Sequence, residues 1–216
     1  MSVERLRDLL ETAARGSFPP PEWGLEFVPA PPRLLGAVVA FTGHHVISAD
    51  VSEEEARTHL DIEDIAAPFN PAFLCWLGER LGAHIGHIDA TLACLGTGAG
   101  DDWLQPMCEP PEYERVRRAR NVRADVEYLG PPDGGAVVIL GEGLARRREL
   151  SMEITDESHR NVGWGTRLVR AAVDRTPMND ALFASVAPGN ARSLRCLLRA
   201  GFRPIGAECI LTTRGA

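Results

Sequence analysis

The residues whose types and spacing are best suited to bind a ligand form a glycine-rich run, R-N-V-G-W-G-T, at positions 160–166. An alternating segment ending at Ile154 precedes this run, and an apolar helical pattern through Leu168 and Val173 follows it. A strand, a glycine loop and a helix start direct consecutive backbone N–H groups at one point, where the helix dipole adds its positive end. The sequence therefore predicts a phosphate-binding loop at 160–166.

Basic residues concentrate in the half of the chain that carries this loop. Residues 1–111 hold 6 Arg against 17 Asp and Glu, whereas residues 112–216 hold 17 Arg against 13. The second half is thus cationic although the chain has a net charge of −7, as an anionic ligand would favour. We expect no nucleic acid partner, because the basic residues lack interleaved aromatics. The chain contains no lysine, which excludes Schiff-base chemistry.

The cysteines and histidines predict no metal site. The five cysteines are scattered, odd in number and without C-x-x-C spacing, as expected of reduced thiols. The six histidines also lack the spacing of metal ligands. No apolar run reaches transmembrane length, and Met1 to Ala14 is a charged amphipathic segment, not a signal peptide. We therefore expect a cytoplasmic protein with no membrane partner.

The first half of the chain predicts an irregular α/β region. A second glycine run at 96–100 precedes Asp101 and Asp102, which would repel phosphate, so we expect a plain loop there. A capping box begins at Ser52. The patterns predict a helix at 3–14, a proline-rich extended connection at 16–33, a hairpin from 34–41 and 45–51, helices from 53 and 71, and a strand at 85–95.

The second half has a more regular order of elements. The patterns predict helices at 111–120, 166–175 and 191–200, and strands at 122–129, 136–140, 145–154, 181–187 and 202–213. A tight turn at 131–135 joins the first two strands. This half therefore reads as a meander of strands followed by a β-α-β-α-β unit.

Two motifs in this half resemble the GNAT N-acetyltransferase superfamily. They are the R-x-x-G-x-G at 160–165 and the N-A-R-S at 190–193, which leads to A-G-F at 200–202, with the strand 181–187 between them. The resemblance covers 122–213 well, 85–120 by element order only, and 1–84 not at all. It implies an α/β (α+β) fold with a mixed, mostly antiparallel central sheet flanked by helices. Residues 85–216 would form the acetyl-CoA-binding domain, and residues 1–84 an N-terminal α/β extension of unknown role.

The resemblance also implies a role for each motif residue. The loop would hold the diphosphate of acetyl-CoA, the backbone before it would pair with the pantetheine arm, and the second motif would position that arm. For Trp164 the alternatives are a lid over the ligand, packing against the protein, and exposure to solvent. The implied cofactor-binding residues are Met152, Ile154, Arg160, Asn161, Val162, Gly163, Trp164, Gly165, Thr166, Asn190 and Ser193.

The groups that would move protons are less well marked. Members of the superfamily often carry a tyrosine acid seven residues after the asparagine, where this chain has Leu197. Tyr128, late on a predicted strand, is an alternative acid. Glu149 and Glu153 share one side of the strand before the loop, and either would relay a proton through water. Surface ion pairs with Arg146 to Arg148 are the alternative role for both carboxylates.

These features lead to an expected function and two alternatives. The chain is predicted to be an acetyl-CoA-dependent N-acetyltransferase, in which an amine attacks the thioester directly, and an acidic first half beside a cationic cofactor site favours a cationic acceptor. The missing tyrosine suggests instead a non-catalytic acyl-CoA-binding or regulatory module. The third alternative is self-association of residues 1–84 into a homodimer through an edge hairpin at 34–51.

Overall fold

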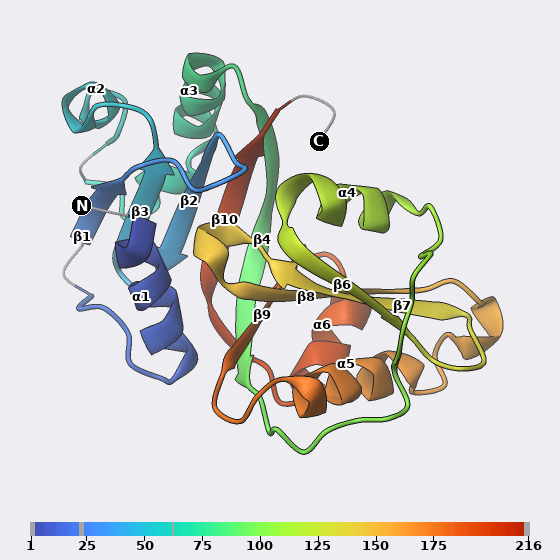
Figure 1. Cartoon of the computed structure of the whole chain (residues 1–216). Coiled ribbons are helices and arrows are strands. Elements are labelled where there is room, and N and C mark those ends of the chain that lie inside the picture. The colour runs from blue at the N-terminus through green and yellow to red at the C-terminus, as the bar shows by residue number, and fades with distance from the viewer. Residues whose placement is uncertain (1–2, 22–23, 62, 214–216) are drawn as a thin grey trace.

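Alternating apolar segments along the chain form the strands of one sheet (Figure 1). The computed structural model describes residues 3–21, 24–61 and 63–213. Within them the strand order is β1-β3-β2-β10-β4-β9-β8-β7-β6-β5. The strands are β1 (Gly24–Val28), β2 (Gly36–Phe41), β3 (His44–Ala49), β4 (His84–Leu95), β5 (Gln105–Pro106), β6 (Ala124–Gly130), β7 (Ala136–Glu142), β8 (Arg148–Ile154), β9 (Ala181–Val186) and β10 (Arg203–Thr212).

Most neighbouring strands of this sheet run antiparallel. The pairs β1/β3 and β8/β9 are the parallel ones among the described strands. The predicted fold class, a mixed and mostly antiparallel sheet flanked by helices, is confirmed.

Helices cover both faces of the sheet because successive side chains of a strand point to opposite sides. On β9, Phe183 packs on the α1 side, whereas Leu182 and Ala184 pack with α5. Figure 1 shows α4 on one side of β6–β8 and α5 with α6 on the other. The helices are α1 (Val3–Ala14), α2 (Glu53–Arg57), α3 (Pro71–Leu81), α4 (Glu114–Val122), α5 (Trp164–Arg175) and α6 (Ala191–Arg199), with short 3-10 turns η1 (Ala67–Phe69), η2 (Leu144–Arg146) and η3 (Glu157–His159).

Local sequence signals place several helix starts correctly. The Ser52 side chain accepts a hydrogen bond from the backbone N–H of Glu55, and Asn70 accepts one from Ala72. The second glycine run is a loop, as predicted, and is held to its neighbour by a 2.8 Å hydrogen bond from the N–H of Gly96 to Asp180.

Three expectations about the strands need correction. The proline-rich connection contains β1, which pairs in parallel with β3 through residues free of proline. The strand before the glycine loop begins at Arg148, because positive φ angles of 52° at Ala145 and 62° at Arg146 turn the chain there. The hairpin 34–51 is not at a sheet edge, since β1 covers β3 and β10 covers β2.

Strand β4 joins the two halves of the chain. It lies between β9 and β10, and β10 pairs in turn with β2. The predicted division into 1–84 and 85–216 therefore falls at the start of an interior strand, and it stays a prediction. None of the described helices combines the length and apolar character needed to cross a bilayer.

Candidate active site

The site begins where the two parallel strands β8 and β9 separate. Their register contains a single pair, Glu149 opposite Phe183. Beyond this pair the strands diverge toward their carboxyl ends, and a cavity of about 270 Å³ lies in the gap. The backbone of β8 beyond Glu149 thus pairs with β7 on one side and lacks a ladder to β9 on the other. A gap of this kind accepts an extended, amide-containing chain as a substitute strand.

The cavity is open to groups from both faces of the sheet. From the α5 and α6 side it is lined by Val169, Asn190, Ser193 and Leu197, and from the α4 side by three arginines. The remaining lining comes mainly from β4, β8, β9 and β10. Two ligands could therefore meet in this gap from opposite faces of the sheet.

The predicted phosphate loop lies between β8 and α5. Arg160 donates a 3.3 Å hydrogen bond to the carbonyl of Ile154 and lies 3.4 Å from the carboxylate of Glu157. Positive φ angles of 64° at Asn161 and 94° at Gly163 turn the chain into α5, whose first turn has no side-chain cap. The first N–H groups of a helix have no intrahelical partner. An exposed guanidinium and free N–H groups are together suited to bind an anion.

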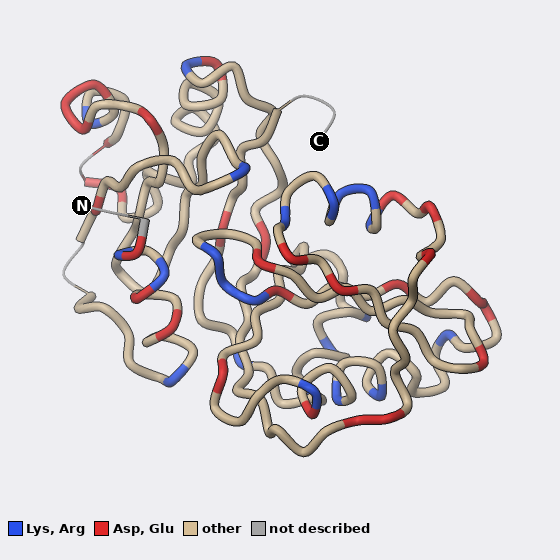
Figure 2. Tube along the Cα trace, viewed as in Figure 1, with Lys and Arg blue, Asp and Glu red and all other residues tan. Residues whose placement is uncertain are grey.

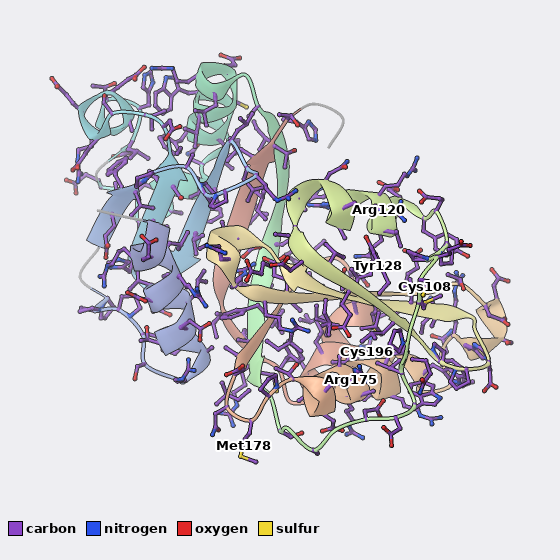
Figure 3. The ribbon with its side chains drawn as sticks, viewed as in Figure 1. Cys108, Arg120, Tyr128, Arg175, Met178 and Cys196 are labelled. Carbon is purple, nitrogen blue, oxygen red and sulfur yellow. The ribbon has the colours of Figure 1, made fainter. Side chains whose placement is uncertain are left out.

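The second loop glycine permits close packing between three elements. A Cβ at Gly165 would lie 2.9 Å from the Cys196 sulfur of α6 and 3.4 Å from the Met152 methyl of β8. Met152 also lines the cavity, so α5 starts directly beside it. Figure 3 shows Cys196 between α5 and α6. Any larger residue at Gly165 would push the start of α5 away from the gap.

Trp164 packs within the loop region. Its ring stacks on His159 with centroids 3.5 Å apart and meets Trp103 edge-on at 5.4 Å. Val162 is exposed, and Thr166 borders a shallow depression on the outer side of α5 together with Arg167. These contacts match the packing alternative for Trp164.

The second motif lies on the opposite side of the gap. Asn190 caps α6 by accepting a 3.1 Å hydrogen bond from the N–H of Ser193, and both residues line the cavity. Leu197, one turn further along α6, is buried in the core and also reaches the cavity. The position where the superfamily often has an acid thus presents an apolar side chain.

A buried charge network lies where β8 and β9 begin to diverge. Arg147, with 0% exposure, donates to Glu149 at 2.9 Å and to Glu208 of β10 at 2.8 Å. Arg123 contacts the other oxygen of Glu149 at 3.1 Å, and Ser185 donates to Glu208 at 2.7 Å. Figure 2 shows the basic stretch before β8 next to acidic positions on the central strands.

This network determines what Glu149 can do. Burial raises the pKa of Glu149, but the charges of Arg147 and Arg123 outweigh burial and hold that pKa below its usual range. A carboxylate that stays ionised and fully bonded is a weak proton acceptor. Glu149 is also only 7% exposed, so the surface role considered from the sequence does not apply to it.

Glu153 and Tyr128 lie away from the cavity lining. Glu153 is partly exposed and lies 3.4 Å from Arg115 of α4, which agrees with the surface ion-pair alternative although the partner differs. Tyr128 packs under α4, with the Arg120 guanidinium 5.7 Å from its ring centroid (Figure 3). Neither side chain is among the residues that line the gap.

The chain is similar in part to several solved structures. No family model matches the sequence, and no curated protein matches it significantly. One matching structure is a GCN5-related N-acetyltransferase from Kribbella flavida, with 16% identity, a TM-score of 0.38, and coverage of 66% of this chain and 64% of that chain, just under two thirds. Another is a GNAT-family acetyltransferase from Colwellia psychrerythraea, with 11% identity, a TM-score of 0.40, and coverage of 78% and 76%.

A third match is AAC(6')-Ib in complex with Parmomycin and acetyl-CoA, with 17% identity, a TM-score of 0.35, and coverage of 58% of this chain and 94% of that chain. The identities are low and the TM-scores lie under 0.5, so these similarities do not establish a function.

Several cavity residues were not selected from the sequence. The gap is also lined by Asp89 of β4, Glu208 of β10, Arg115 and Arg118 of α4, and Arg123 directly after α4. A signal existed, since the polar residues His87, Asp89 and Thr91 alternate with apolar ones in the middle of β4, and Glu208 interrupts an apolar segment of β10. His87 of β4 also lines the cavity. The described residues hold no group of three or more His, Cys, Asp or Glu side chains arranged for a metal ion.

Proposed function

We propose that this protein is an acetyl-CoA-dependent N-acetyltransferase. The observation that carries the proposal is the gap between β8 and β9, which has a glycine loop and an uncapped helix start at one end and a polar cavity reaching the opposite face of the sheet. Acetyl-CoA has a diphosphate for such a loop and two amides for an unpaired strand edge. The acceptor would then approach the thioester from the α4 side.

The residues present fit acetyl-CoA in three respects. Arg160 and the free N–H groups of Val162 to Thr166 would bind the diphosphate. The β8 backbone from Met152 to Ile154 would pair with the pantetheine amides, and Asn190 and Ser193 would border the arm on the α6 side. Gly165 lets α5 begin close to Cys196 and Met152, so the loop stays beside the gap.

The chemistry requires few groups once the two substrates are aligned. Direct attack by a neutral amine forms a tetrahedral intermediate, so the site must accept a proton and stabilise an oxyanion. Alignment alone contributes a large part of such an acceleration. Leu197 supplies no proton to the departing thiolate, which would take one from solvent.

Calorimetric titration with acetyl-CoA tests the cofactor site. We expect binding in the micromolar to sub-millimolar range, weakened by Arg160→Gln because one charge-assisted contact to phosphate is lost. Arg148→Gln provides a matched control, since Arg148 pairs with Glu127 away from the loop. Absence of binding at sub-millimolar acetyl-CoA would refute the proposal.

A non-catalytic acyl-CoA sensor is the second candidate. The buried Leu197 at the position of the expected acid favours it. Thiol release from acetyl-CoA, measured with a panel of amines, separates the two functions, because a sensor binds acetyl-CoA without turnover. Self-association of the N-terminal region, cytoplasmic location and the absence of nucleic acid and membrane partners stay predictions.

A further inference from the structure

The carboxylates of the cavity differ in how fully they are bonded. Glu208 accepts hydrogen bonds from Thr91, Arg147 and Ser185. Glu149 is also fully engaged, by two guanidiniums and a backbone N–H. Both carboxylates are therefore committed to the protein itself.

Asp89 is the third carboxylate that lines the cavity, and it is not fully bonded. It lies directly opposite Glu208 in the β4/β10 register and lines the gap. Its Oδ1 atom is buried and has no hydrogen-bond partner among the described residues. A buried carboxylate oxygen without a partner is costly in a folded protein, and such groups often serve a ligand. The chemistry that matches it is a cationic donor such as an ammonium group.

The electrostatic surroundings of Asp89 also suit proton transfer. Burial raises the pKa of Asp89, and the neighbouring Glu208 raises it further. Arg118 and Arg115 of α4 and His87 of β4 oppose this effect, and on β10 the buried thiol of Cys209 is the other titratable neighbour. A carboxylate with a raised pKa is a better proton acceptor than an ordinary one.

Among the described residues, one arginine on the opposite wall of the cavity has neither an ion pair nor a hydrogen bond. Arg115 pairs with Glu153, and Arg123 pairs with Glu149 and donates to Ser151. Arg118 lines the same cavity and makes no ion pair or hydrogen bond with a described residue. The gap therefore offers one free carboxylate on β4 and one free guanidinium on α4. With a volume of about 270 Å³, it suits a small molecule.

We propose that the acceptor is a small primary amine that also carries a carboxylate or phosphate group, with its ammonium at Asp89 and its anionic group at Arg118. This inference rests on the proposed acetyltransferase function. One proton of the ammonium passes to Asp89 and then to solvent, and the nitrogen attacks the thioester carbon. The C–N bond forms, the C–S bond breaks, the nitrogen releases its second proton to solvent, and the leaving thiolate takes a proton from solvent.

Three matched pairs of amines test the acceptor class through thiol release from acetyl-CoA. They are β-alanine with propylamine, 4-aminobutyrate with butylamine, and 2-aminoethyl phosphate with 2-aminoethanol. We expect kcat/KM about 10- to 100-fold higher for the anionic member, as one charge-assisted contact provides. The carboxylate and phosphate pairs show which anion is preferred. Equal rates within all three pairs overturn the inference.

Substitutions at Arg118 and Asp89 test which residue binds each end of the acceptor. Arg118→Gln should raise KM for anionic amines about tenfold and leave the neutral amines unchanged, whereas Arg117→Gln, outside the cavity lining on the same helix, should change neither. Asp89→Asn should lower kcat about 100-fold or more for both classes and remove the acidic limb of the pH profile. An unchanged pH profile, or an equal effect of Arg118→Gln on both classes, overturns the assignment.

Acetyl-CoA titration of the same variants separates this inference from the proposed function. Unchanged cofactor affinity shows that Asp89→Asn and Arg118→Gln remain folded. If the wild-type protein binds acetyl-CoA but releases no thiol with any of the six amines, the inference on the acceptor is overturned. If it does not bind acetyl-CoA, the proposed function fails as well.

Discussion

Replacing Arg147 by methionine should destabilise the protein more than any neighbouring charge removal. Its guanidinium is fully buried and bridges Glu149 and Glu208 at 2.9 and 2.8 Å. Methionine has a similar length but leaves two buried carboxylates without this partner. Breaking a buried ion pair by removing one member costs about 3–5 kcal/mol. For a chain of this size, that corresponds to a fall in Tm of roughly 6–20 °C.

The adjacent Arg148 provides the control. Its side chain is 40% exposed and pairs with the equally exposed Glu127 at 3.1 Å, so Arg148→Met should cost about 0–1 kcal/mol. Urea unfolding followed by tryptophan fluorescence and by circular dichroism measures both variants. Adding Glu208→Gln to Arg147→Met should restore part of the stability, because one of the two unpaired charges is removed.

Acidification provides an independent check of the same reasoning. In the wild type, the folded-state pKa of Glu149 lies below its unfolded value of 4.5, so the ion pairs contribute stability above that pH and lose it as pH falls through the folded pKa. In Arg147→Met, burial without the bridging charge raises the folded-state pKa of Glu149 instead. The difference in stability between variant and wild type should therefore narrow from pH 7 to pH 5. Equal losses for the two arginine variants, or a gap that widens on acidification, would refute this account.

Three smaller predictions follow from single positions. Gly163→Ala should lower the free energy of unfolding in urea by about 1–2 kcal/mol, because φ is 94° there. No atom lies within 4 Å of the new Cβ, so the loss would come from backbone strain and not from a clash. Gly189→Ala, with equal space and no positive φ, should be neutral, and equal losses for the two variants would contradict the strain argument. Burial raises the pKa of the Cys209 thiol to about 11, so Cys209 should resist iodoacetamide at pH 8 while the exposed Cys75 reacts. Mass spectrometry measures the labelling of each cysteine, and labelling of both at the same rate would contradict this prediction. Asn70→Ala should cost about 1 kcal/mol through loss of the α3 cap, and an unchanged unfolding midpoint would argue against that contribution.

The sequence predicted those parts of the fold that depend on nearby residues. The start of α3 at Pro71, the run of α5 from the glycine loop and the cap of α6 at Asn190 each follow from signals within a few residues. The alternation in β8 also placed Glu149 and Glu153 on one side of the strand. The alternation could not show that Glu149 is buried and Glu153 partly exposed, because this difference depends on β10 and α4, which lie far away in the chain.

The missed parts of the site share this dependence on distant contacts. Asp89 becomes a cavity residue only because β4 pairs with β10 and β9, a pairing that no local pattern specifies. Arg118 lines the gap because α4 packs over β7 through Val116 and Ala119. The glycine loop was found because its function depends on backbone geometry, which a short sequence specifies directly.

The central position of β10 has a consequence for how the chain reaches this structure during synthesis. This strand pairs with β2 on one edge and β4 on the other, so it joins the first three strands to the rest of the sheet. The edges of β2 and β4 that pair with β10 stay open until β10 emerges from the ribosome, long after β2 and β4 have been made. Pairings between distant segments form slowly, and open strand edges invite association with other chains. We therefore expect the nascent protein to depend on chaperones until its last described strand is available.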